Sequence, residues 1–535
     1  MEEHYTVLNP CGQFNDVMLA PLSPRPADYS GKTVWFVLPW ADRHGFDVVI
    51  SGLERFLTEK YPGIRIVTRA RGSYSSDDPQ LWAEMRRDCD AFVYFAAPSC
   101  STTAYAVTWP ARALERTGVP GCVVLYTYLE EDALMSQERE GMKIRYVKTP
   151  YPCDSISADA LDALLEDIDT ALTAAPAGEE LQSGIYTPKA PERIAFTGTY
   201  DEVQDYFYAQ KWTDGLPIVP PTEERVAAML RGTSHAPEEV ICTEMAPEGR
   251  KVTVEKAAVV AVMAGAEPAY FPVILAMIEI MGRSQRYHAT SKSTNAFSYM
   301  QVVNGPIRDE IGMNSSVYAL GAGNKANAVL GRAHRLALTC LGGSEVGVNL
   351  MGVMGNVSSY TFAFAENEES SPWSPLSVRQ GFQKDESVLT IFVGGFSHSG
   401  NYMLDPGMER MAAAARTFEF CNGFTLLCAP KRAADLAAEG YDTREKTEHY
   451  LWELTHCTKA ELKRSGQWGR AIKRDIESGG GQYDPAYLDA PDDAMCAMYW
   501  EPEITVVCVG DPKGTNVMQA WHMSHADSAS IDKWR

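Results

Sequence analysis

The alternation of short apolar runs with amphipathic helical runs over residues 1–175 constrains the fold more than any other feature. Five apolar runs have the length of strands, at 33–38, 64–68, 91–95, 122–126 and 144–147. Helical runs lie between and after them, at 46–60, 79–87, 104–117 and 158–174. Apolar strands that are separated by helices form a parallel sheet covered on both faces. The pattern predicts an α/β fold with a flavodoxin-like, doubly wound parallel sheet.

The 535 residues exceed what one hydrophobic core holds, so a second domain is expected. Residues 174–192 are rich in Ala, Pro and Glu, which is typical of a surface connection. Beyond them we expect helices at 200–211, 254–281 and 326–340, and strands at 388–393, 424–427 and 504–509. The predicted division is a flavodoxin-like domain at 1–175, a linker at 176–192, and a larger second α/β domain at 193–535 that completes the active site.

The net charge and the amino-acid composition limit the classes of partner that the chain can bind. The net charge of −22 would repel a phosphate backbone, which excludes nucleic acid, although a local positive field could hold a small anion. No apolar run reaches about 18 residues and the acidic N-terminus is not a signal peptide, so we expect no membrane partner. The 12 cysteines form no CxxC pair, which indicates reduced thiols in a cytoplasmic protein. We expect no cofactor and no metal, and leave a homo-oligomer open.

Cys100 is the strongest catalytic candidate. A buried strand at 91–95 ends, a loop of small and hydroxylated residues follows, and a helix is expected to begin near Thr103. Ligands of open α/β sheets bind outside the carboxyl ends of the strands, and a helix N-terminus favours a thiolate, the reactive form of cysteine. The neighbouring hydroxyls could hold the substrate or simply cap the helix; they belong to Ser99, Ser101, Thr102 and Thr103. The alternative is a small apolar cysteine in a capped turn.

Four short runs carry a resemblance to a known family: LNP at 8–10, LSPRPADYSGK at 22–32, CDA at 89–91 and LERTGVP at 114–120. With these runs, residues 8–172 resemble the UGSC-like family, whose motif has selenocysteine or cysteine before Gly-Ser-Cys. The resemblance places the first motif residue on Cys100 and implies thiol redox chemistry. The second motif cysteine falls on Thr103, so a neighbouring dithiol is not available from this loop. The run GNKANAVLGRAHRL at 323–336 also resembles a large domain that accompanies such modules.

Proton transfer to or from Cys100 needs a base. His44 and Asp42 follow the first strand, so their loop is expected on the same rim as Cys100. They could activate the thiol or hold the substrate, and we expect His44 to be catalytic and Asp42 to bind substrate. His398 stands in a Gly/Ser loop at the end of a second-domain strand and is a further candidate for a general base.

An anionic end of the substrate would need a positive site. Gly323 and Asn324 open a helix and offer backbone N–H groups, while Arg332 lies on the following turns. We expect these three residues to bind substrate, the alternative being a tight turn beside a solvated helix face. Lys292 and His288 are expected in a surface loop rather than in a domain cleft. His522 and His525 have one-turn spacing but no clear third ligand, so no metal is assigned to them.

Three functions remain open from the sequence. The first is an enzyme that uses Cys100 as a nucleophile or acid–base thiol on a small polar or anionic substrate, by hydrolysis, acyl transfer or elimination, in a cleft between the two domains. The second is a thiol oxidoreductase with a resolving cysteine from elsewhere in the chain. The third is a non-catalytic protein that binds a small ligand.

Overall fold

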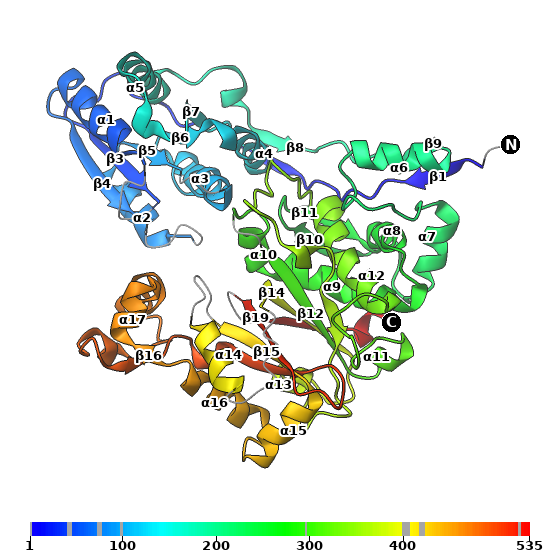
Figure 1. Cartoon of the computed structure of the whole chain (residues 1–535). Coiled ribbons are helices and arrows are strands. Elements are labelled where there is room, and N and C mark those ends of the chain that lie inside the picture. Colours follow the sequence, from blue (N-terminus) through cyan, green and yellow to red (C-terminus); the bar gives the residue numbers. More distant parts are fainter. Residues whose placement is uncertain are drawn as a thin grey trace.

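The computed structural model describes residues 3–39, 45–71, 77–96, 100–294, 297–398, 407–416, 423–522 and 526–535. Within these ranges it places the backbone but not the side chains of residues 100–106, 285, 289, 395–398, 407 and 470. Two sheets organise the chain, a five-stranded one near the N-terminus and a seven-stranded one in the second part (Figure 1).

The first sheet is entirely parallel and has the order β4-β3-β5-β6-β7. Its strands are β3 (Thr33–Leu38), β4 (Arg65–Ala70), β5 (Ala91–Phe95), β6 (Gly121–Tyr126) and β7 (Arg145–Thr149). In sequence order this is 2-1-3-4-5, the order of the flavodoxin-like fold. Helices α1 (Asp47–Lys60) and α5 (Ala158–Thr173) cover one face, while α2 (Pro79–Asp88), α3 (Cys100–Ala113) and α4 (Glu130–Glu140) cover the other (Figure 1). The predicted flavodoxin-like fold class is therefore confirmed.

Helix α4 is the one element of this sheet's cover that the apolar pattern did not reveal. Its sequence, EEDALMSQERE, is mostly charged, and its buried face is polar apart from Ala133. That face consists of Asp132, Ala133, Ser136, Gln137 and Glu140. A helix that buries polar side chains leaves no hydrophobic periodicity to detect, and those buried groups then need polar partners.

The second part is built on a mixed sheet of order β13-β12-β14-β19-β15-β18, with β20 also paired to β14. Its strands are β12 (Ser298–Asn304), β13 (Ala363–Ala365), β14 (Val388–His398), β15 (Gly423–Cys428), β18 (Ile504–Cys508), β19 (Val517–His522) and β20 (Asp527–Ser530). Helices α8 (Val254–Ala264), α9 (Phe271–Arg283) and α12 (Lys325–Leu336) form its main helical core. The second α/β part predicted from the sequence is thus present.

The single helix expected at 254–281 is two helices. Gly265 ends α8 in the left-handed region, with φ +87°, and its N–H caps the carbonyl of Val262. Pro268 and Pro272 then start a short 3₁₀ turn and α9, where a proline at the first helical positions removes no needed N–H. The apolar pattern runs through the break because both helices are buried.

The remaining helices and strands belong to the second part of the chain. Further helices are α6 (Tyr200–Ala209), α7 (Glu223–Leu230), α10 (Gln285–Thr290), α11 (Ile307–Glu310), α13 (Leu376–Arg379), α14 (Gly407–Ala415), α15 (Pro430–Ala438), α16 (Arg444–Leu454), α17 (Lys459–Arg464) and α18 (Lys473–Ser478). Two small antiparallel sheets pair β10 (Val240–Met245) with β11 (Arg250–Thr253), and β16 (Cys457–Thr458) with β17 (Met495–Cys496). Along the part of the chain that the structure describes, no helix has both the length and the apolar character to cross a membrane.

The chain's first strand belongs to the second part, not to the domain expected at 1–175. Strand β1 (Tyr5–Leu8) pairs with β9 (Ile194–Gly198). Val7 and Leu8 are buried in the hydrophobic core formed by α8 and α9. The N-terminal residues therefore reach across to the second part before the chain enters the first sheet.

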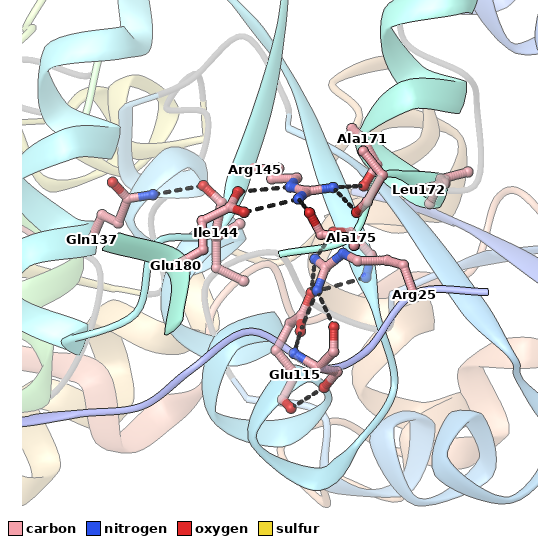
Figure 2. A network of polar contacts seen from close by, with 12 residues as sticks. Arg25, Glu115, Gln137, Ile144, Arg145, Ala171, Leu172, Ala175 and Glu180 are labelled. Carbon is pink, nitrogen blue, oxygen red and sulfur yellow. Dashed lines mark hydrogen bonds and ion pairs between the residues drawn. The ribbon is translucent and has the colours of Figure 1, made fainter. Parts of the chain in front are cut away.

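The segment expected as a linker, 176–192, connects the two parts and is itself ordered. Its strand β8 (Gly184–Tyr186) pairs with β2 (Val17–Leu19). Glu180 accepts two hydrogen bonds from Arg145 at the start of β7, at 2.7 and 2.8 Å (Figure 2). This pair anchors the connection to the first sheet.

A buried ion pair joins two of the runs that carry the family resemblance. Arg25, from the run at 22–32, lies 2.5 Å from Glu115, from the run at 114–120, and both side chains are fully buried (Figure 2). Glu115 also accepts hydrogen bonds from the backbone N–H groups of Ser23 and Gly121. Gly121 begins β6, so this pair stabilises the amino-end edge of the sheet, opposite the edge where ligands of such folds bind.

Candidate active site at the sheet switch point

The two central strands of the first sheet diverge at their carboxyl ends. The chain leaves β3 toward α1 on one face, and it leaves the adjacent β5 toward α3 on the other. Such a switch point opens a crevice between the two connections, and it is where doubly wound folds bind their ligands. Cys100 is the first residue of α3, five positions after β5 ends at Phe95. The catalytic candidate therefore stands at the switch point.

Several predicted site residues belong to the two loops at this point. Asp42, His44 and Ser99 lie outside the described residues. Residues 101–103, which include the hydroxyl candidates Ser101, Thr102 and Thr103, form the first turn of α3 after Cys100, and their side chains lie outside the description. The helix thus begins three residues earlier than the expected start near Thr103.

The described rim of this edge is aromatic. The ring of Phe46, which precedes α1, stacks on Tyr126 at 4.8 Å and meets Phe95 edge-on at 5.3 Å. Tyr126 ends β6 and also contacts Tyr128 and Tyr151. These rings pack together at the carboxyl ends of β5 and β6, where Phe46, Phe95 and Tyr126 are buried and Tyr128 and Tyr151 are exposed.

A second thiol lies on the same edge, at Cys153 after β7. Its Sγ donates to the backbone carbonyl of Gly45 at 2.5 Å, and the Tyr126 hydroxyl is 3.9 Å away. Gly45 directly follows His44 in the sequence. Burial raises the pKa of the Cys153 thiol, so this residue is held as a neutral thiol on the α1 side of the sheet.

Arg71 is a cationic residue of this edge that the sequence analysis missed. It directly follows β4, and its backbone N–H donates to the carbonyl of Leu38 at the end of β3. Its guanidinium donates to the Tyr94 hydroxyl at 3.0 Å and lies 4.0 Å from the Trp109 ring centroid on α3. The signal in the sequence was the place of Arg71 directly after a strand of the parallel sheet, at its carboxyl end.

Comparison with known proteins finds a family model and solved structures that resemble part of the chain. Residues 6–175 match the sequence model of the UGSC family. The UGSC-like segment predicted from the four short runs is therefore confirmed, and it contains the whole first sheet. Among solved structures, the flavodoxin-like domain of a Synechococcus sp. protein is 15% identical, with a TM-score of 0.19, and the match covers 26% of this chain and 95% of that chain. No curated protein matches the chain.

The cysteines whose side chains are described share one environment. Ten cysteines are described, all are free thiols, and each is buried or half-buried. Burial raises the pKa of every one of these ten thiols, to about 12 for Cys89, Cys122, Cys242 and Cys508 and to about 11 for Cys457. A buried neutral thiol is inert, so these ten residues are poor nucleophiles.

The second part reaches the UGSC-like segment through Lys292, which is buried and does not lie in a surface loop as expected. Its Nζ is 2.8 Å from Asp132 on α4 and 2.8 Å from Glu248 in the turn between β10 and β11. The three side chains are at most 3% exposed. Asn349 donates to Glu248 at 2.7 Å, and Arg139 lies 3.7 Å from it. A charged cluster therefore joins the two parts.

Two residues of the predicted anion site, Asn324 and Arg332, are bonded to other residues of the second part. Arg332 pairs with Asp214 at 2.8 Å and donates to the carbonyl of Pro217 at 2.8 Å. Asn324 caps α12 by accepting from the N–H of Asn327, and it donates to Gly312. Gly323 precedes this cap with φ +119°. These contacts hold the start of α12 and the turn at Asp214 together, and they do not bring the three residues to the edge of the first sheet.

The histidine candidates of the second part lie on its sheet. His398 ends β14, where its backbone pairs with Gln519 of β19; its side chain is not described. His522 ends β19, is buried, and has its Nδ1 3.7 Å from Glu503. It lines a cavity of about 100 Å³ together with Arg379 and Thr505. His525 lies outside the described residues, and within the described ranges no group of three or more His, Cys, Asp or Glu side chains is arranged to hold a metal ion.

Proposed function

We propose that the chain is a cysteine-dependent enzyme whose reactive group is Cys100 of the UGSC-like segment. It would act on a small polar or anionic substrate as a nucleophile or acid–base thiol, in hydrolysis, acyl transfer or elimination. The observation that carries the proposal is the position of Cys100 as the first residue of a 14-residue helix at the switch point. The positive end of the helix dipole favours a thiolate there, whereas burial keeps the ten described cysteines protonated.

The surroundings support a substrate that is small, with an anionic or polar end. Arg71 supplies a positive charge at the carboxyl edge, next to the end of β3. A guanidinium presents planar donors that match a carboxylate or phosphate. The aromatic rings around Tyr126 would pack against an apolar part of the substrate. Arg332, the anion-binding candidate of the sequence, pairs with Asp214.

A thiol oxidoreductase is the second candidate, and Cys153 is the observation that favours it. Both cysteines follow strands of the first sheet at the same edge, with β6 between those strands. Two strand spacings amount to about 10 Å, whereas a disulfide needs Cα atoms within about 7 Å. Cys153 also bonds on the α1 side, while Cys100 begins a helix of the opposite face. We therefore rank the nucleophile above the dithiol.

The free thiols of the ten described cysteines fit a reducing compartment such as the cytoplasm.

Covalent trapping tests the proposed function. The purified protein is incubated with a panel of small activated acyl compounds, including thioesters and p-nitrophenyl esters of short carboxylic and dicarboxylic acids. Intact-mass and peptide mass spectrometry then locate any adduct. We expect a single acyl adduct on Cys100 that the Cys100→Ser variant does not form, while Cys153→Ser forms it normally. Adducts spread over several cysteines, or an adduct that persists in Cys100→Ser, would contradict the proposal.

A further inference from the structure

Helices α3 and α4 lie side by side on one face of the first sheet, and both follow parallel strands (Figure 1). Two contacts fix how they are aligned. Arg112 of α3 lies 2.6 Å from Glu140 of α4, and Arg139 of α4 donates to Thr108 of α3 at 3.3 Å. Both helices rise about 1.5 Å per residue, so counting back along each places Asp132 level with residues 101–104. Asp132 is therefore level, along the two helix axes, with the turn of α3 that Cys100 begins.

Asp132 has one oxygen engaged and one that faces no partner. Oδ1 accepts from Lys292, whereas Oδ2 is buried and makes no hydrogen bond to a described residue. Ser136 Oγ is buried in the same condition one turn further along α4, and Glu140 Oε1, two turns along, also makes no hydrogen bond to a described residue but lies 3.9 Å from Arg139 Nε. Buried oxygens of this kind accept hydrogen bonds from water or from a ligand. The three atoms form a polar line along α4 that runs from Arg112, which is 64% exposed, to the level of Cys100.

The two carboxyl groups that share Lys292 differ in how readily they take up a proton. Burial and the nearby Glu248 charge raise the pKa of Asp132 above its ordinary value, and the attraction of Lys292 does not fully offset them. Burial alone would also raise the pKa of Glu248, but the charges of Lys292 and Arg139 outweigh burial and lower it. Of the two, Asp132 is therefore the carboxyl group that takes up a proton more readily. The charged groups that act on it are Lys292, Glu248 and Arg139, and its own charge acts on the buried Tyr146. His288 lies near Lys292 and Arg139.

We propose that Asp132, held by Lys292 and Glu248 of the second part, is the proton acceptor and donor of the Cys100 site. The inference rests on the proposed function. In the forward step the S–H bond of Cys100 breaks and an O–H bond forms on Asp132 Oδ2, directly or through one water, which gives a thiolate and a neutral carboxyl group. Asp132 later returns that proton to the leaving group, so that the carboxylate is restored. The second part thereby completes the active site by positioning this carboxyl group.

The test is the pH dependence of Cys100 alkylation in the full-length protein, with iodoacetamide as probe and peptide mass spectrometry as readout. A thiol and a carboxyl group that share a proton titrate as a coupled pair in two steps. We expect two steps for the unmodified chain and a single step for Asp132→Asn. A single step in both proteins, at the same pH, would overturn the inference.

Two further variants distinguish the effect of the Glu248 charge on Asp132 from a general disturbance of the fold. Glu248→Gln keeps the hydrogen bonds of Lys292 but removes the charge that raises the pKa of Asp132, so the lower step should move to lower pH; an unmoved step overturns the inference even if Asp132→Asn does not fold. The control, Glu115→Gln, disturbs a buried pair at the opposite edge of the sheet and should leave both steps unchanged. The failure of the proposed function has a different signature, because Cys100 would then be slow to react at every pH.

Discussion

At the scale of single residues, two cysteines of the first sheet differ in their place in the fold. Cys100 begins a helix at the switch point, whereas Cys153 is buried with its Sγ bonded to the Gly45 carbonyl. The spacing of their strands and their opposite faces predict that they do not form a disulfide. Treatment with diamide followed by non-reducing peptide mapping should therefore give no Cys100–Cys153 link. A link that forms quantitatively would favour the oxidoreductase.

At the scale of elements, the buried Arg25–Glu115 pair is expected to hold the fold rather than the site. Glu115→Gln leaves Arg25 buried without its counter-charge, which should cost about 3 kcal/mol in the free energy of unfolding. Urea denaturation measures this loss. The rate of Cys100 alkylation in the native variant should stay within the wild-type range, and a slowed rate would show that the pair acts on the site.

The sequence predicted most elements of the first sheet because their residues bury continuous apolar faces. Strands β3 and β5 have the bounds that were expected, and β4, β6 and β7 differ from them by two residues or fewer at each end. Helix α4 could not be predicted, because its buried face is carried by Asp132, Ser136 and Glu140. The break at Gly265 was hidden for the opposite reason, since apolar residues continue on both sides of it.

The candidate site was predictable to the extent that it follows strand order. The position of Cys100 after a central strand could be read from the alternation of elements and from the family resemblance. The burial of Lys292 could not, because its partners Asp132 and Glu248 are 160 and 44 residues away in the chain. Arg332 was a candidate for anion binding because its partner Asp214, 118 residues away, was not visible in the sequence.

At the scale of the whole molecule, the charged cluster that joins the two parts makes stability depend on pH. The carboxylates of Asp132 and Glu248 outweigh burial and raise the pKa of Lys292 above 10.5. The stabilisation by Lys292 is therefore complete below pH 10.5 and is lost as the pH rises through the folded-state pKa. At acid pH the group that matters is Glu248, whose pKa is lowered below 4.5. The stabilisation that its carboxylate provides is therefore lost as the pH falls below 4.5.

Thermal unfolding of the wild type and of Lys292→Met tests the predicted loss of stability at alkaline pH. We expect the wild type to be more stable at neutral pH, because the variant leaves two buried carboxyl groups without their cation. The difference in Tm should shrink above pH 10.5, where Lys292 loses its charge in the wild type. A difference that stays constant across this range would show that Lys292 contributes packing and not charge.

The central claim is that Cys100 is the reactive thiol of this protein, and competitive alkylation tests it most directly. The native full-length chain is treated with a limiting amount of iodoacetamide at neutral pH, and the modified peptides are quantified over time. Cys100 should be labelled ahead of the ten described cysteines, whose pKa values are all raised by burial. Placement of Cys100 among the slowest sites, behind thiols such as Cys122 or Cys340, would contradict the account.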